Sequence, residues 1–199
     1  MAKIRRDRQF FEESGGGVTF SGGECLAQID FLEALAKNCK KEGISVAIDT
    51  CGHEAWQSFE RILPYCDLFL YDIKILDSQL HQQYTGQDNS LILENLAKLS
   101  SAGARIWLRF PIIGGVNLDE GHVNDLWEIC CKIRHERAEL LPYHPMAEGK
   151  LAKMGQGVED FGFYSPTEAD LAKIRGKINK PTSSLRAPCG RWDCGSSPQ

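Results

Sequence analysis

Apolar residues follow two different periods along this chain. Short, almost continuous apolar runs predict five buried strands, and longer stretches with an apolar residue every three or four positions predict the helices between them. We expect the strands within residues 18–20, 44–52, 67–74, 106–111 and 138–144. The helices are expected within residues 29–41, 54–63, 78–100, 119–135 and 167–178, the third with a break near Gly86. This alternation predicts an α/β fold with a parallel sheet, either open or part of a barrel.

Polar residues gather where the predicted strands end. The first strand lies inside a glycine-rich stretch, residues 15–24, and glycines on both sides of a strand indicate a tight turn or a close approach to a ligand. The polar residues at or just after the ends of successive strands are Ser21, Glu24, Asp49, Thr50, Asp72, Lys74, Arg109 and His144. Because the carboxyl ends of parallel strands meet at one edge, we expect these side chains around one pocket.

Composition and charge narrow the class of partner. The chain has 199 residues, of which 42% are hydrophobic and 25% charged, and its net charge is −4, so it gives no electrostatic sign of a nucleic-acid partner. No apolar run approaches the roughly 18 residues of a membrane span. The polar start of the chain lacks the apolar core of a signal peptide. We therefore expect a cytoplasmic protein with no membrane partner.

Eight cysteines are many for a chain of this length. They are Cys25, Cys39, Cys51, Cys66, Cys130, Cys131, Cys189 and Cys194. Their spacing contains neither C-x2-C nor C-x3-C, and without a signal peptide we expect reduced thiols, most of them buried.

The residue types at the predicted pocket suggest an amino-acid ligand. Asp49 and Asp72 offer oxygen ligands to a cation, with Thr50 beside them. Lys74 and Arg109 suit a carboxylate or phosphate, and Ser21 and Glu24 suit an ammonium group. A divalent-metal hydrolase built on the two aspartates is an alternative, and the lack of a histidine cluster argues against it.

Five ordered motifs carry a more specific signal. They are Gly15-Gly16-Gly17-Val18-Thr19-Phe20-Ser21-Gly22-Gly23-Glu24, Asp49-Thr50-Cys51-Gly52, Tyr71-Asp72-Ile73-Lys74, Arg109-Phe110-Pro111-Ile112-Ile113-Gly114-Gly115-Val116-Asn117 and Leu140-Leu141-Pro142-Tyr143-His144. Together they closely resemble the glycyl-radical-enzyme activating proteins, the pyruvate formate-lyase activating enzyme family of radical S-adenosylmethionine (radical SAM) enzymes. The resemblance covers about residues 5–179.

The resemblance implies a fold and a reaction. The fold is a partial parallel (β/α)6 radical-SAM barrel, with about five βα units in residues 15–179, a lead-in segment at 1–14 and a tail at 180–199 expected to be unstructured. The reaction is that of a radical SAM oxidoreductase. S-adenosylmethionine is cleaved reductively at a [4Fe-4S] cluster to a 5′-deoxyadenosyl radical, which abstracts hydrogen from a glycine of a partner glycyl radical enzyme. Flavodoxin or ferredoxin is the electron donor that the resemblance implies.

The resemblance also assigns the site residues. Ser21, Gly22, Gly23 and Glu24 would hold the methionine amino group. The site for a monovalent cation would contain Asp49, Thr50 and Asp72. Lys74 would lie near the methionine carboxylate, His144 by the ribose, and Arg109 within the pocket.

The sequence differs from the family in one feature, and this difference leaves two hypotheses open. The family's cluster ligands form a C-x3-C-x2-C loop upstream of the glycine motif, and this sequence contains no such triplet, so no cluster ligand or catalytic residue is assigned within it. We therefore keep two hypotheses. The chain belongs to an activating enzyme whose cluster ligands lie outside it, or it is a catalytically incomplete fragment or S-adenosylmethionine-binding remnant without cluster chemistry.

Overall fold

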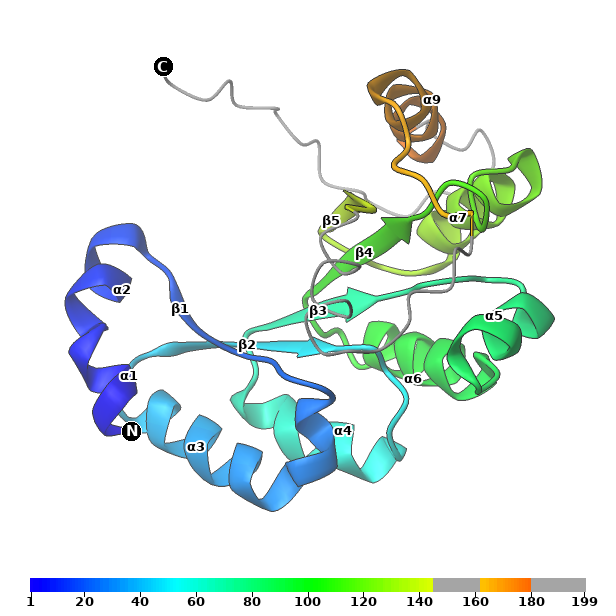
Figure 1. The fold of residues 1–199 in the computed structure, drawn as a ribbon. Helices are drawn as coiled ribbons and strands as arrows, with labels where there is room; N and C mark the ends of the chain where they lie inside the picture. Colours follow the sequence, from blue (N-terminus) through cyan, green and yellow to red (C-terminus); the bar gives the residue numbers. More distant parts are fainter. Residues whose placement is uncertain (145–161, 180–199) are drawn as a thin grey trace, which may run out of the picture.

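The computed structural model describes residues 1–144 and 162–179. Its centre is a five-stranded parallel sheet in the order β1-β2-β3-β4-β5 (Figure 1). The strands are β1 (Gly17–Phe20), β2 (Ser45–Thr50), β3 (Leu68–Asp72), β4 (Ile106–Ile112) and β5 (Arg137–Pro142). Each strand pairs with the next one in the chain, so the polar residues at the strand ends all come to one edge. The predicted α/β fold with about five βα units is confirmed.

The connecting helices fall close to their predicted positions. They are η1 (Cys25–Gln28), α3 (Ile29–Lys41), α4 (Trp56–Ile62), η2 (Leu63–Tyr65), α5 (Ser78–Thr85), α6 (Ser90–Ser101), α7 (Glu120–Lys132) and α9 (Glu168–Ile178). The predicted break near Gly86 is confirmed, because this glycine ends α5 with a left-handed φ of 81°. Thr167 caps α9 through a reciprocal capping box with Asp170.

Two short helices, α1 (Ala2–Arg6) and α2 (Arg8–Ser14), form where the sequence predicts only a lead-in segment. Helices this short are not stable alone, so tertiary contacts decide them. Ile4 and Phe11 pack against the core, and Arg5 binds Glu42 with an Nη2 to Oε1 distance of 2.7 Å. The predicted unstructured tail at 180–199, with Cys189 and Cys194, lies outside the described residues.

Helices cover one face of the sheet. Figure 1 shows α3, α4 and α6 below the strands in that view, and α7 beside β4. Along β2, Val46, Ile48 and Thr50 are buried, whereas Ala47 and Asp49 alternate with them and stay partly exposed. The side chains buried against the helices form the core, and the opposite, partly exposed face carries the polar residues of the candidate site.

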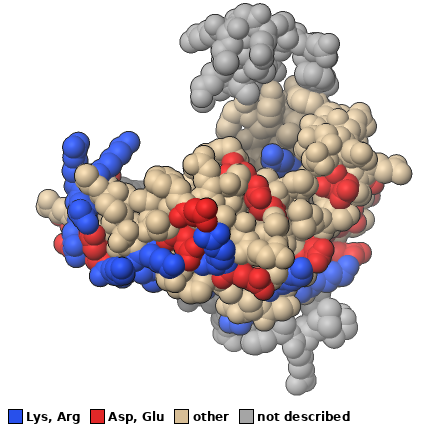
Figure 2. All heavy atoms as spheres, turned by 90° about the horizontal axis from the view of Figure 1, so that it is seen from below, with Lys and Arg blue, Asp and Glu red and all other residues tan. Residues whose placement is uncertain are grey.

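The helix-covered side carries charges of both signs. Figure 2, seen from below, shows blue and red side chains next to one another over these helices. Between α3 and α4, for example, Arg61 binds Asp30 at 2.7 Å and Glu33 at 2.6 Å. Among the described residues, no helix is long and apolar enough to cross a lipid bilayer.

Candidate functional site

Arg109 joins two carboxylates at the carboxyl edge of the sheet. Its Nε donates to Asp72 Oδ1 at 2.6 Å, and its Nη2 donates to Asp49 Oδ1. Ser21 extends the network from β1, because its hydroxyl donates to Asp49 Oδ2 at 3.1 Å. Four of the predicted site residues, from the ends of β1 and β2 and from β3 and β4, therefore form one continuous chain of polar contacts.

Burial gives this network its electrostatic character. The side chains of Arg109, Asp49 and Asp72 are only 17%, 22% and 24% exposed. Burial raises the pKa of Asp72, and the hydrogen bond from Arg109 offsets only part of that rise. Burial lowers the pKa of Arg109, but the hydrogen bonds and charges of the two aspartates outweigh burial and raise it. The guanidinium therefore stays charged and pairs with both carboxylates, which offsets one of their two negative charges.

Glu24 lies in a second cluster, on the helix-covered side of the loops. Its Oε1 accepts from the Leu26 N–H at 3.2 Å, and its Oε2 accepts from the Thr50 hydroxyl at 2.9 Å and the Cys51 N–H at 3.0 Å. The Cys51 thiol also lies 3.2 Å from Oε2. Glu24 thus connects the loop after β1 to the loop after β2, and most of its acceptor capacity is used within the chain.

The neighbouring thiols are held neutral. Burial, together with the charge of Glu24, raises the pKa of Cys25 to about 12. Burial also raises the pKa of Cys51, with Glu24 adding to the shift. Metals bind thiolates, so raised pKa values do not favour these two cysteines as ligands. Within residues 1–144 and 162–179, no group of three or more His, Cys, Asp or Glu side chains is placed to hold a metal ion.

Glycines leave an open cradle beside this cluster. A Cβ atom at Gly22 or Gly23 would meet no heavy atom within 4 Å, so the main chain there is accessible to a ligand. Gly52 is the opposite case, because its φ is 82° and a Cβ would lie 1.9 Å from the Tyr71 hydroxyl. Glycine at 52 is therefore required by packing, and at 22 and 23 it keeps space free.

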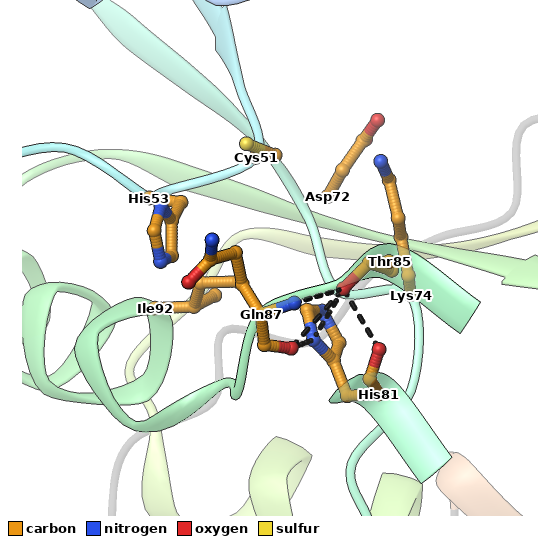
Figure 3. A pocket seen from close by; sticks show the side chains of 8 residues that line it. All are labelled: Cys51, His53, Asp72, Lys74, His81, Thr85, Gln87 and Ile92. Atoms are coloured by element: carbon orange, nitrogen blue, oxygen red, sulfur yellow. Dashed lines mark hydrogen bonds between the residues drawn. The ribbon is translucent and has the colours of Figure 1, made fainter. Parts of the chain in front are cut away.

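A cavity of about 190 Å³ adjoins the network on the β3 side. It is lined by Cys51, His53, Asp72, Lys74, His81, Thr85, Gln87 and Ile92 (Figure 3). His81 Nδ1 lies 2.7 Å from the Gln87 carbonyl oxygen, which can only accept, so Nδ1 is the donor in this hydrogen bond. Lys74 is exposed at the cavity, and no ion pair forms to it from the described residues.

The predicted residues do not all face one pocket. Thr50 follows Asp49 directly, so strand alternation turns its side chain to the opposite face, where it is 2% exposed and bound to Glu24. His144 lies beyond the end of β5 and is exposed. The functional roles that the sequence suggests for these residues stay predictions.

Two kinds of residue around the site, histidines and buried asparagines, are not predicted from the sequence. His53 and His81 line the cavity, and the buried Asn95 and Asn117 hold the loops around the site. An asparagine inside a predicted helix, as Asn95 is, was a usable signal, because its side chain has little reason to be buried there without a partner.

Comparison with known proteins identifies the relatives of this chain. The sequence model of the radical SAM superfamily matches residues 2–126. The chain is 43% identical over 176 residues to the trans-4-hydroxy-L-proline dehydratase activating enzyme of Clostridioides difficile, with 87% of this chain and 58% of that protein covered. It is 31% identical over 183 residues to the pyruvate formate-lyase 1-activating enzyme of Escherichia coli K12, with 90% and 74% covered.

A solved structure agrees with these relatives. A domain of the pyruvate-formate lyase-activating enzyme from Bacteroides vulgatus is similar with a TM-score of 0.70 and 32% identity, covering 82% of this chain and 92% of that one. The chain spans about three fifths of the trans-4-hydroxy-L-proline dehydratase activating enzyme, at 58%, and of the choline trimethylamine-lyase activating enzyme of Oleidesulfovibrio alaskensis, at 61%.

Proposed function

This chain belongs to the radical SAM superfamily and to its glycyl-radical-enzyme activating enzymes, and we propose that it supplies the S-adenosylmethionine site of such an enzyme. The observation that supports the proposal is the chain of contacts from Ser21 through Asp49 and Arg109 to Asp72, beside an open glycine cradle. Charged groups of both signs at one edge of a parallel sheet suit a ligand with an ammonium and a carboxylate.

Each predicted residue has a role in this proposal. The accessible main chain at Gly22 and Gly23 accepts hydrogen bonds from the methionine amino group, and Ser21 borders it. Glu24 contributes mainly by fixing the two loops that form the cradle. Lys74 neutralises the methionine carboxylate from the cavity side. His144 contacts the ribose, and Arg109 keeps the two aspartates in place.

When bound, S-adenosylmethionine and a [4Fe-4S] cluster would supply the radical that abstracts hydrogen from a glycine of the partner. The glycine cradle and the charged residues fit S-adenosylmethionine. The described residues do not fit the cluster, because no three of them form a set of metal ligands. What this chain contributes is therefore binding and orientation, and no electron-transfer step is assigned to its side chains.

A monovalent cation at Asp49, Thr50 and Asp72 is a finer part of the proposal. Arg109 already lies between the two carboxylates, so a cation would have to displace its guanidinium or bind beside it. Arg109→Ala would then increase the affinity for K⁺ or for its spectroscopic substitute Tl⁺, measured by thallium NMR. Unchanged affinity in this variant would argue against a cation between these aspartates.

The proposed partner is a cytoplasmic glycyl radical enzyme, with flavodoxin or ferredoxin as electron donor. The names of the relatives refer to trans-4-hydroxy-L-proline dehydratase, choline trimethylamine-lyase, (2S)-3-sulfopropanediol dehydratase and pyruvate formate-lyase. The four enzymes form a panel in which the partner can be sought. Each would be incubated anaerobically with the protein, S-adenosylmethionine and a reductant, and its glycyl radical would be detected by electron paramagnetic resonance.

The deciding experiment is anaerobic reconstitution with iron and sulfide, followed by reduction and electron paramagnetic resonance with and without S-adenosylmethionine. A [4Fe-4S]⁺ signal that S-adenosylmethionine perturbs is the expected result for a protein with a complete site. Binding of S-adenosylmethionine without a cluster signal would support the alternative, a binding remnant without cluster chemistry, which the lack of a ligand set in the described residues favours. Absence of both would refute the proposal.

A further inference from the structure

Buried asparagines lie behind the loops that form the carboxyl edge. Asn95 and Asn117 are 0% exposed and Asn89 is 4% exposed. Their side-chain amides donate to main-chain carbonyl groups in the loops after β2 and β3 and, at Pro111, near the end of β4. None of the three belongs to the charged network, so their contribution to the site has to act through the loops.

Asn117 connects the loop after β3 to the end of β4. Its Nδ2 donates to the carbonyl oxygen of Lys74 at 2.9 Å and to that of Pro111 at 2.8 Å. Its Oδ1 accepts from the Ile113 N–H at 2.7 Å. Both N–H donors of this amide and its oxygen are therefore hydrogen-bonded. The main chain of Lys74 is thereby fixed to the strand that carries Arg109.

Asn95 binds the main chain of the loop after β2. Its Nδ2 donates to the Gly52 carbonyl oxygen at 2.9 Å and to that of Glu54 at 2.7 Å. Its Oδ1 is buried without a hydrogen-bond partner among the described residues. A buried acceptor without a partner destabilises the fold, so the two donated bonds have to offset that cost. The same loop is held from the other side by Glu24 through the Cys51 N–H.

We propose that Asn117 and Asn95 are positioning residues for S-adenosylmethionine, Asn117 acting through Lys74 and Asn95 acting through the loop at Cys51 and Gly52. This inference rests on the proposed function. A charged group binds a small ligand well only when its main chain is fixed, because displacement by about 1 Å already lowers binding or rate substantially. Lys74 is exposed and has a long, flexible side chain, so its carbonyl contact with Asn117 is the constraint nearest to its Cα.

A double-mutant cycle tests the Asn117 arm. Asn117→Ser is expected to weaken S-adenosylmethionine binding about tenfold, measured by anaerobic equilibrium dialysis with labelled S-adenosylmethionine. Because the effect acts through Lys74, Asn117→Ser should cause no further loss in a Lys74→Ala background. Losses that multiply in the double variant, or unchanged binding in Asn117→Ser, would overturn the proposal for this residue.

Hydrogen exchange supplies a readout that does not depend on the ligand. Asn117→Ser should accelerate exchange of the amides at residues 74–76 and at Ile113, while the amides of β2 stay protected. Asn38→Ser is the control, because the exposed Asn38 donates to the carbonyl of Ala34 on the solvent side of α3, far from these loops in the chain. The control should change neither exchange in these loops nor S-adenosylmethionine binding.

The two readouts separate failure of this inference from failure of the proposed function. If the wild-type protein binds no S-adenosylmethionine, the proposed function fails, and faster exchange at residues 74–76 still supports the positioning part. Unchanged exchange refutes the positioning part in either case. Should Asn117→Ser not fold, as judged by circular dichroism, Asn95→Ser provides the same test for the amides of Cys51 to Glu54.

Discussion

Two arginines, one just before β4 and one in the middle of it, bind carboxylates in different ways. Arg105, just before the strand, binds one partner, Glu136, through Nε at 2.6 Å and Nη2 at 3.1 Å, and its side chain is 61% exposed. Arg109, inside the strand, binds two partners on two neighbouring strands and is 17% exposed. The Arg105–Glu136 pair has good geometry, but water screens it. The cluster of Arg109, Asp49 and Asp72 is mostly shielded from water, so removing the guanidinium leaves the two carboxylates without their ion-pair partner.

This difference between the two arginines agrees with a general rule for parallel βα folds. Residues at the amino edge of such sheets mainly serve stability, and residues at the carboxyl edge form sites. At the amino edge, Asp67 accepts from the Val46 N–H at 2.8 Å and pairs with Lys40 at 2.6 Å. At the carboxyl edge, Glu24 and Arg109 hold loops and strand ends around open space.

The largest effect is expected for Arg109→Ala. Without the guanidinium, Asp49 and Asp72 face each other as partly buried carboxylates, with only the exposed Lys74, among the described residues, as a nearby positive charge. Breaking a fully buried pair costs about 3–5 kcal/mol, and because these side chains are about a fifth exposed we expect about 2–3 kcal/mol. Urea unfolding monitored by circular dichroism measures the loss. Asp49→Asn in the same background should restore part of it, and a loss below about 1 kcal/mol would show that the site is better solvated than its burial indicates.

Glu24→Gln should have the next largest effect. The amide keeps one acceptor oxygen but replaces the other with a donor, so the N–H of Leu26 or the donors at Thr50 and Cys51 lose a partner. We expect a loss of about 1–2 kcal/mol in the free energy of unfolding. Asp67→Asn, the corresponding change at the amino edge, is the comparison variant. An equal loss in the two variants would remove the distinction between the two edges.

Arg105→Ala should have a small effect. Exposed ion pairs contribute about 0.2–1 kcal/mol, and this pair has one side chain well in solvent. The same urea titration as for Arg109→Ala gives the comparison directly. If the two arginine variants lose similar stability, the difference in burial between Arg105 and Arg109 does not affect the strength of their ion pairs.

The smallest effect concerns pH, where the stability contributions of Glu136 and Asp72 should change in opposite directions. Hydrogen bonding to Arg105 lowers the pKa of Glu136 below its usual 4.5, so Glu136 stabilises the fold above pH 4.5 and loses this contribution as the pH falls through its lowered pKa. Burial raises the pKa of Asp72 above its usual 3.8, so its contribution decreases as the pH rises from 3.8 through the raised pKa.

Unfolding free energies between pH 3 and pH 6 for wild type, Glu136→Gln and Asp72→Asn measure both contributions. The difference between wild type and Glu136→Gln should grow with pH, and the difference between wild type and Asp72→Asn should shrink. Two differences of the same sign would contradict the contrast in environment between the two carboxylates.

Much of the fold follows from the sequence alone. The continuous apolar runs and the three-to-four-residue period determine which segments are strands and which are helices, because each period places a stripe or a face of apolar surface toward the core. The alternating order then allows few topologies, and the observed β1-β2-β3-β4-β5 order is the simplest of them. The gathering of Ser21, Asp49, Asp72 and Arg109 at one edge follows from the same reasoning.

Tertiary structure alone decided which of these residues touch. Arg109 lies 60 residues from Asp49 and 37 from Asp72 in the chain, and only strand register brings the three together. Glu24 and Thr50 meet on the other face because side chains alternate along a strand, and the lead-in segment is helical because it packs on the core. Asn95 and Asn117 donate hydrogen bonds to loops 41–43 residues away in the chain. A local sequence pattern cannot predict these contacts, because it does not show which carbonyl groups a distant loop presents.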